Sequence, residues 1–302
     1  MAEIRAVVRD HPDVLHREIT AITDVAPLLR EWAAQNLDLV VVNGGDGTVQ
    51  AVMTEILNHD PFGRSIPLAI MPGGKTNMFA MDLGCRGKPV HVLRRILAAA
   101  DAGTIAARTV DRPLVGLRRA PGESVIYGTF FGTAVVVRGV EYCRAHVYPL
   151  GLPNFISHII AYGMLIGGSL TRNHGPDSPF RADDISITLD GDQRLSGRYF
   201  LIIVSSLDRL ILGMRPFGAE GEGRLNFFCV DHSPGVILRV SAKALLTRPK
   251  HFSARGTMTR RIRKASLILD CPVILDGEFY HPEPNQPLEL LGDRSLPFVE
   301  LK

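Results

Sequence analysis

The chain has 302 residues, of which 46% are hydrophobic and 22% are charged. This ordinary globular composition allows two domains and a sizeable core, and a net charge of +3 is too small to indicate nucleic-acid binding. The scattered cysteines form no CxxC pair, which argues against a zinc site or a disulfide framework and is typical of a reducing cytosol: Cys85, Cys143, Cys229 and Cys271. Residues 1–10 contain no basic segment followed by an apolar one, so we expect no signal peptide.

The first informative segment is an apolar run that leads into a glycine cluster. Residues 37–42 have the β-branched side chains of a buried strand, and residues 49–58 are apolar at helical spacing. The residues just before that helix read Asn43-Gly44-Gly45-Asp46-Gly47-Thr48. The glycines allow a sharp turn and close approach of a ligand, and Thr48 is expected to cap the helix. Because a helix start directs N–H groups and a positive dipole end toward one point, the segment predicts a phosphate site.

A second strand and glycine loop follow. Residues 66–71 form a short apolar run that leads into Pro72-Gly73-Gly74-Lys75-Thr76-Asn77. Two strand–loop pairs linked by a helix describe a βαβ unit, whose loops lie at the carboxyl ends of the strands, where open α/β sheets bind ligands. Neither loop has the spacing of a Walker A motif or of a dinucleotide-binding fingerprint.

The character of the sequence changes after residue 112. Before it, further helices are expected at residues 27–34 and 89–102. After it, strand patterns separated by turn residues dominate, at 125–137, 185–189, 199–204, 225–230 and 266–275. The predicted fold class is α/β plus all-β: an open α/β nucleotide-binding domain in residues 1–112, then a mainly antiparallel β-sandwich with an inserted helix in residues 113–295.

Residues 147–171 contain no charged side chain and are long enough to span a bilayer. Two prolines and several polar residues, including Asn154 and His158, argue against a transmembrane helix. Apolar residues on one helical face favour a helix near residues 153–170 that covers a β-sheet, with insertion at a membrane surface as the alternative.

Together the motifs resemble the diacylglycerol kinase catalytic-domain family, which includes bacterial lipid kinases and sphingosine kinases and is distantly related to NAD kinases. The resemblance rests on the two glycine loops, with Phe79-Ala80 after the second, and on Leu275-Asp276-Gly277-Glu278. Their order and spacing match over almost the whole chain. In that family the C-terminal segment returns to the first domain, so we expect residues 296–302 to do the same.

The resemblance implies a role for each candidate residue. Nucleotide-binding positions are Asn43, Gly44, Gly45, Asp46, Gly47, Thr48, Gly73, Gly74, Lys75, Thr76 and Asn77. Asp46 would partner the Mg²⁺ of the nucleotide during catalysis, and Glu278 would be the general base for the acceptor hydroxyl. Lys75 either contacts phosphate or is a solvated loop residue. The alternative for Asp276-Gly277 is a simple hairpin turn with Glu278 exposed.

Among the departures from the family pattern, two concern the acceptor and the metal. Met78 stands where relatives with glycerolipid substrates have an acidic residue, which leaves the acceptor open. Glu222 replaces an aspartate that binds a structural Mg²⁺ in relatives. We expect Glu222 to bind this metal, and a plain loop charge is the alternative.

The predicted function is an ATP- and Mg²⁺-dependent lipid kinase that transfers the γ-phosphate to a hydroxyl of diacylglycerol or a related lipid. The alternatives are a kinase for a non-lipid acceptor, as in NAD kinases, and a nucleotide-binding regulatory protein with impaired activity. We expect a cytoplasmic protein in peripheral contact with the inner membrane surface, where its lipid substrate lies, and leave a homodimer open. The basic residues 248–264 either bind anionic headgroups or form a solvated strand edge.

Overall fold

The computed structural model describes residues 1–142, 144–145, 183–210, 217–218, 220–247 and 255–302. The chain divides into two compact units, Met1–Arg112 with Ser295–Lys302, and Pro113–Arg294. The first unit thus contains both ends of the chain.

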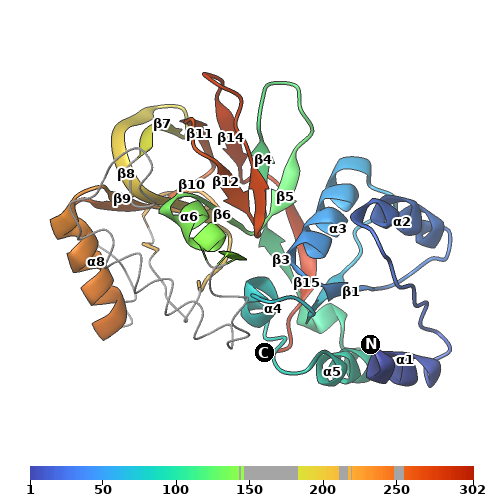
Figure 1. Cartoon of the computed structure of the whole chain (residues 1–302). Helices are drawn as coiled ribbons and strands as arrows, with labels where there is room; N and C mark the ends of the chain where they lie inside the picture. The colour runs from blue at the N-terminus through green and yellow to red at the C-terminus, as the bar shows by residue number, and fades with distance from the viewer. Residues whose placement is uncertain (143, 146–182, 211–216, 219, 248–254) are drawn as a thin grey trace. The chain divides into compact units, whose positions relative to one another are not determined.

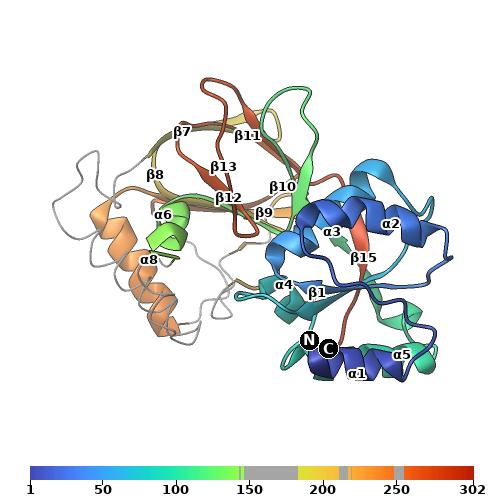
Figure 2. The ribbon, with the colours of Figure 1, turned by 45° about the vertical axis from the view of Figure 1, so that its right-hand side comes forward.

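The first unit is an open α/β sheet with helices on both faces. Its elements are α1 (Ala2–Arg9), α2 (Val25–Ala33), β1 (Val40–Gly44), α3 (Asp46–His59), β2 (Leu68–Pro72), α4 (Met78–Asp82), α5 (Pro89–Asp101), β3 (Thr109–Pro113) and β15 (Ser295–Val299). The sheet order is β1-β2-β15-β3, and β1 and β15 run parallel to β2. Helices α2 and α3 cover one face, and α1 and α5 lie side by side on the other (Figures 1 and 2).

Strands β1 and β2 bear the two glycine loops. Residues 68–71 of β2 are all buried, as expected for a strand covered on both faces. The register pairs Asn43 with Met71 and Gly44 with Pro72, so both strands end at the same level. The loops that follow them therefore begin side by side at the carboxyl edge of the sheet.

The C-terminal segment completes this sheet and packs against α4. Phe298 pairs with Leu68 of β2 and is fully buried, with its ring edge-on to Phe79 at 4.7 Å between centroids. The Leu301 amide donates to the Leu83 carbonyl at 2.8 Å. The end of the chain thereby fixes α4, which begins directly after the second glycine loop.

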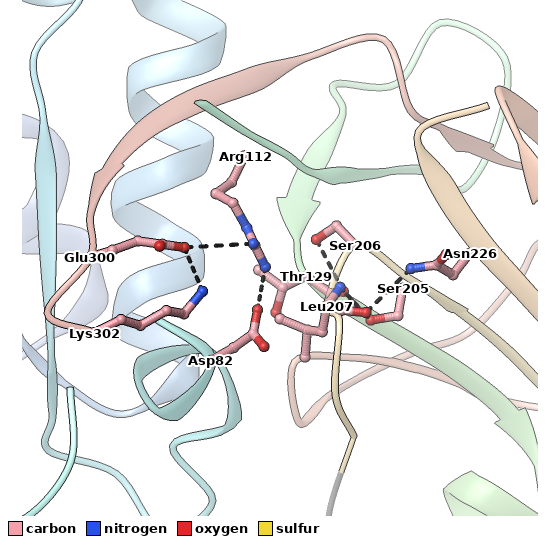
Figure 3. A network of polar contacts seen from close by, with 9 residues as sticks. All are labelled: Asp82, Arg112, Thr129, Ser205, Ser206, Leu207, Asn226, Glu300 and Lys302. Carbon is pink, nitrogen blue, oxygen red and sulfur yellow. Dashed lines mark hydrogen bonds and ion pairs between the residues drawn. The ribbon is translucent and has the colours of Figure 1, made fainter. Parts of the chain in front are cut away.

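A buried ion pair also holds α4. Arg112 at the end of β3 pairs with Asp82, the last residue of α4, and lies 3.8 Å from the Glu300 carboxylate. Lys302 in turn pairs with Glu300 at 2.8 Å (Figure 3). Both acidic residues and Arg112 are largely buried, so this cluster depends on mutual compensation of charge.

The second unit is built on a large antiparallel sheet. Its described elements are β4 (Val115–Arg118), β5 (Ile126–Gly128), β6 (Phe130–Ala134), α6 (Val135–Tyr142), β7 (Asp183–Leu189), β8 (Gln193–Ser205), β9 (Leu225–Asp231), α8 (Pro234–Thr247), β10 (Thr257–Ile262), β11 (Lys264–Ile268), β12 (Val273–Leu275), β13 (Glu278–Tyr280) and β14 (Leu288–Leu291). Within the described residues, the strands expected to form a sandwich are hydrogen bonded into one sheet of 11 strands. The long β8 joins its parts, because it pairs with β7 through its first half and with β6 and β9 through its second. The predicted fold class is confirmed.

Three details of the second unit differ from the sequence prediction. Residues 135–137 begin α6 instead of continuing a strand, since Ala134 has a φ of 60° that ends β6. The expected strand 266–275 is two strands, β11 and β12. Helix α8 had not been predicted.

The expected helix near residues 153–170 and most of the uncharged segment 147–171 lie outside the described residues. In the part of the chain that the structure describes, no helix has the length and hydropathy needed to cross a membrane.

Candidate functional site

The two glycine loops meet in the first unit. A Cβ atom on Gly74 would lie 2.8 Å from the Gly45 Cα and 3.5 Å from the Asp46 amide nitrogen. A Cβ on Gly73 would lie 2.9 Å from the Gly44 amide nitrogen. Only glycine therefore permits this packing of one loop on the other. The structure brings all eleven predicted nucleotide-binding residues into one region.

Gly44 and Gly45 are glycines for different reasons. A Cβ on Gly44 would lie 2.7 Å from the Cβ of Thr48, so the threonine side chain excludes any other residue there. A Cβ on Gly45 would meet only the Gly74 Cα, at an ordinary 3.7 Å, and its φ of −78° suits any residue. We infer that space at Gly45 is kept for something outside the chain.

The helix start lies beside this space. Gly45 is the N-cap of α3, and its carbonyl accepts from the amides of Thr48 and Val49. The prediction that Thr48 caps the helix is wrong, because α3 begins two residues earlier, at Asp46. The amides of Asp46 and Gly47 precede the first intrahelical hydrogen bonds, and together with the helix dipole they favour an anion.

Asn77 holds the second loop closed. It adopts the left-handed conformation, with φ 51°, and is the N-cap of α4. Its Oδ1 accepts from the Gly74 amide and its Nδ2 donates to the Gly74 carbonyl, both at 2.7 Å. The Asn77 amide group is therefore occupied in shaping the loop. Lys75, at the loop tip, is exposed, and Thr76 is partly buried.

Asn43 carries an unsatisfied buried acceptor. Its Oδ1 is buried and accepts no hydrogen bond within the described structure, and a Cβ on Gly73 would lie 2.9 Å from this atom. Its Nδ2 makes a long contact of 3.6 Å with the Met1 sulfur. Since buried acceptors are nearly always bonded, a ligand donor or a water molecule is expected at this position.

The chemistry of Asp46 suits a metal that arrives with a nucleotide. Asp46 is half-buried in the first turn of α3. No group of three or more His, Cys, Asp or Glu side chains that could hold a metal occurs among the described residues. Mg²⁺ commonly takes one or two carboxylates and completes its shell with water and phosphate oxygens, so the single Asp46 carboxylate fits this mode.

Glu222 lies in the second unit and is a poorer candidate for a metal. Its side chain is 84% exposed and its Oε2 lies 2.5 Å from Nη2 of Arg263. A guanidinium at this distance competes with a cation for the carboxylate. The structure thus favours the alternative of a loop charge.

Glu278 lies in the second unit on the β12–β13 hairpin. Asp276 and Gly277 have φ of 48° and 92° and form its two-residue turn, and Glu278 pairs with Leu275. The Glu278 side chain is exposed, as the hairpin alternative expected. Asp276, by contrast, is buried and accepts hydrogen bonds from Thr129 and Phe130. Sequence reasoning missed this role, because the partners lie almost 150 positions away.

The basic stretch is partly engaged within the second unit. Residues 248–254 lie outside the described part of the chain. Of the remainder, Arg260 donates to the Gln193 side chain at 2.5 Å and Arg263 pairs with Glu222. Arg261 is exposed on β10. These contacts favour the interpretation of a solvated strand edge.

Comparison with known proteins agrees with the predicted resemblance. Residues 3–106 match the family described as "Diacylglycerol kinase catalytic domain". A "Probable lipid kinase YegS-like" from Klebsiella pneumoniae (strain 342) is 22% identical over 251 residues, covering 82% of this chain and 80% of the relative. A protein of the same name from Enterobacter sp. (strain 638) is 20% identical over 287 residues, covering 88% and 91%. A crystal structure of a diacylglycerol kinase from Bacillus anthracis str. Sterne has the same fold, with a TM-score of 0.60, 18% identity, and coverage of 99% of this chain and 88% of that one.

Proposed function

We propose that this protein is an ATP-dependent lipid kinase. The observation that carries the proposal is the contact of the two glycine loops beside the start of α3, within residues that match the diacylglycerol kinase catalytic domain. Packed glycines, helix amides and a half-buried carboxylate suit the phosphates of a nucleotide. The names of the two relatives support a lipid as the acceptor.

Each proposed residue has one task. The Asp46 and Gly47 amides bind phosphate oxygens, and Asn43 Oδ1 accepts a donor of the nucleotide. Mg²⁺ bound with the nucleotide beside Asp46 would neutralise charge on the phosphates. Glu278 accepts the proton of the lipid hydroxyl while the hydroxyl oxygen forms a bond to the γ-phosphorus and the bond from that phosphorus to the bridging oxygen breaks, which leaves ADP.

The acceptor is proposed to be diacylglycerol or a lipid of similar shape with one free hydroxyl. Met78, the first residue of α4, provides no carboxylate near the loop, so recognition of the lipid has to rely on other residues. The lipid would be taken from a membrane surface, which makes peripheral contact with a bilayer part of the proposal.

The test is transfer of labelled γ-phosphate from ATP to a total membrane lipid extract, with the product identified by mass spectrometry. We expect one class of phosphorylated lipid with the unaltered protein and a loss of about 10²–10⁴-fold in kcat for Glu278→Gln, with nucleotide affinity unchanged. Phosphorylation of NAD but of no lipid would favour the NAD kinase-like alternative. ATP binding without any product would favour the impaired regulatory protein. Either result would overturn the proposal.

A further inference from the structure

The turn that precedes Glu278 is fixed by a buried carboxylate. Asp276 is 8% exposed. Its Oδ2 accepts from the Thr129 amide at 2.8 Å, and its Oδ1 accepts from the Thr129 hydroxyl at 2.8 Å and from the Phe130 amide at 2.9 Å. A buried carboxylate that accepts this many hydrogen bonds is locked in one position.

The backbone around Asp276 is shaped to receive this carboxylate. The Asp276 amide donates to the Phe130 carbonyl at 2.9 Å, which extends the pairing of β12 with β6 beyond Leu275. A Cβ on Gly128 would lie 2.6 Å from the Asp276 Oδ2 and 2.7 Å from the Leu275 Cγ. Glycine at position 128 is therefore needed for the carboxylate to reach its donors.

Thr129, which donates two hydrogen bonds to Asp276, is itself held by further hydrogen bonds. The Thr129 carbonyl accepts from the Ser205 hydroxyl at 2.8 Å (Figure 3). It also accepts from the Ser206 amide at 3.0 Å. The Ser205 hydroxyl oxygen accepts from the Leu207 amide at 3.1 Å, and the Leu207 carbonyl accepts from Asn226 at 3.2 Å. The anchor of the hairpin thus extends through the ends of β8 and β9.

A second contact holds the other side of the turn. Arg144 donates from Nη2 to the Gly277 carbonyl at 2.6 Å, and its guanidinium carbon lies 4.6 Å from the centre of the Phe279 ring. The residues on both sides of Glu278 are therefore fixed, while the Glu278 side chain is exposed. This is the arrangement expected for a reactive side chain on a rigid support.

We propose that Asp276 is a positioning residue that holds the hairpin so that Glu278 can take the proton of the acceptor. This inference rests on the proposed function. A hairpin of this type forms without a buried acid, since an Asp-Gly turn needs only the two positive φ values. The same chain provides the comparison. Asp190-Gly191 lies in the β7–β8 turn, whose loop has three residues because Leu189 pairs with Gln193. Its φ values are 52° and 93°, and the Asp190 Oδ1 accepts from the amides of Arg263 and Lys264 at 2.7 and 3.0 Å.

The experiment compares Asp276→Asn, Glu278→Gln, their double variant and the matched control Asp190→Asn, assayed with Mg·ATP and vesicles of total lipid extract. The side chain of asparagine would place an N–H group against the donors of Thr129 and Phe130, so the hairpin would lose some of the hydrogen bonds that hold it. We expect Asp276→Asn to lower kcat about 10–100-fold with the dissociation constant for ATP unchanged. The double variant should be no slower than Glu278→Gln, because Asp276 acts through Glu278. Asp190→Asn should keep the kcat of the unaltered protein.

Two further variants cover the case in which Asp276→Asn does not fold. Thr129→Val removes one of the three hydrogen bonds and should lower kcat by a smaller factor than Asp276→Asn does. Thr129→Ser keeps the hydroxyl and should have the kcat of the unaltered protein. Normal kcat in Asp276→Asn or Thr129→Val, or additive losses in the double variant, would overturn the proposal.

Hydrogen exchange separates this proposal from the proposed function. Asp276→Asn should speed amide exchange in residues 275–280 more than Asp190→Asn does, whatever the substrate is. Unchanged exchange would overturn the anchoring role even if the protein is a lipid kinase. If Asp276→Asn exchanges faster but the unaltered protein phosphorylates no lipid, the anchoring role of Asp276 would be supported. The catalytic role of the hairpin and the proposed function would then both be rejected.

Discussion

At the scale of single residues, packing requires glycine at three positions of the two loops and leaves space for a side chain at a fourth. Gly73 and Gly74 touch the backbone of the other loop, and Gly44 touches Thr48. Gly45 alone among these four has room for a methyl group. The sequence shows four equivalent glycines, and only the contacts separate the three structural positions from the one that we propose faces a ligand.

This division makes a prediction for two alanine variants. Gly74→Ala should destabilise the protein by about 1–3 kcal/mol, because the methyl group would overlap the Gly45 backbone. Gly45→Ala should change the free energy of unfolding by less than about 1 kcal/mol but weaken ATP binding, since the methyl group enters the space beside the helix start. Urea unfolding and calorimetry measure the two effects. Unchanged ATP affinity in Gly45→Ala would show that this space is not the phosphate site.

Asp46→Ala should lower kcat about 10²–10³-fold by removing one electrostatic contact of the reacting phosphates. The stability cost should be at most about 1 kcal/mol, the usual contribution of an acid in the first helical turn. Asp38→Ala is the control, because the fully exposed Asp38 carries the same charge just before β1. Equal activity of a folded Asp46→Ala protein and the control in the lipid assay would place the metal–phosphate group elsewhere.

At the scale of elements, β15 links the end of the chain to the glycine loops through Phe298 and α4. Phe298→Ala should destabilise the protein by about 3–5 kcal/mol, because it opens a cavity between β2 and α4. Ile268→Ala, at a position that is 46% exposed, should cost less than about 1 kcal/mol. Denaturant unfolding of both variants tests this. Similar losses for the two would mean that β15 contributes little to the first unit.

The same scale shows what the sequence could predict. Several elements of the first unit follow local patterns: apolar runs for β1 and β2, helical spacing for α3, and a glycine stop after α5. Helix α1 and strand β3 are not among the predicted elements. The second unit follows its patterns less closely. The expected strand over 125–137 runs into α6, since only Ala134 in an unusual conformation marks the change. Helix α8 is not among the predicted elements, although Ser233-Pro234 at its start and Pro249 beyond Thr247 are helix-boundary signals.

For the candidate site, the sequence indicated residue types but not their partners. Asp46 and the glycines could be identified because their chemistry is local to one loop. The burial of Asp276 and the closed ring between Asn77 and Gly74 depend on contacts that no spacing rule encodes. For Glu222, the ion pair with Arg263 favours a loop charge, and binding of a metal at this position stays a prediction.

At the scale of the whole molecule, each unit has its own buried apolar residues, and the described free cysteines are among them. Cys85, Cys229 and Cys271 are free and buried, and burial raises the pKa of Cys85 to about 11 and that of Cys229 to about 12. Their thiols stay protonated at pH 8 and should resist alkylation in the folded protein but react fully in urea. Peptide mapping after labelling measures this. Rapid native labelling of Cys85 or Cys229 would contradict the packing of the unit concerned.

The central claim is that the two glycine loops of the first unit hold the phosphates of a nucleotide. Hydrogen exchange of the full chain with and without Mg·ATP tests it most directly, because it needs no knowledge of the acceptor. The account predicts slower exchange in peptides that cover residues 43–49 and 72–78, and unchanged exchange in α5. Binding of ATP, measured by calorimetry on the same sample, without protection of either loop would contradict the account.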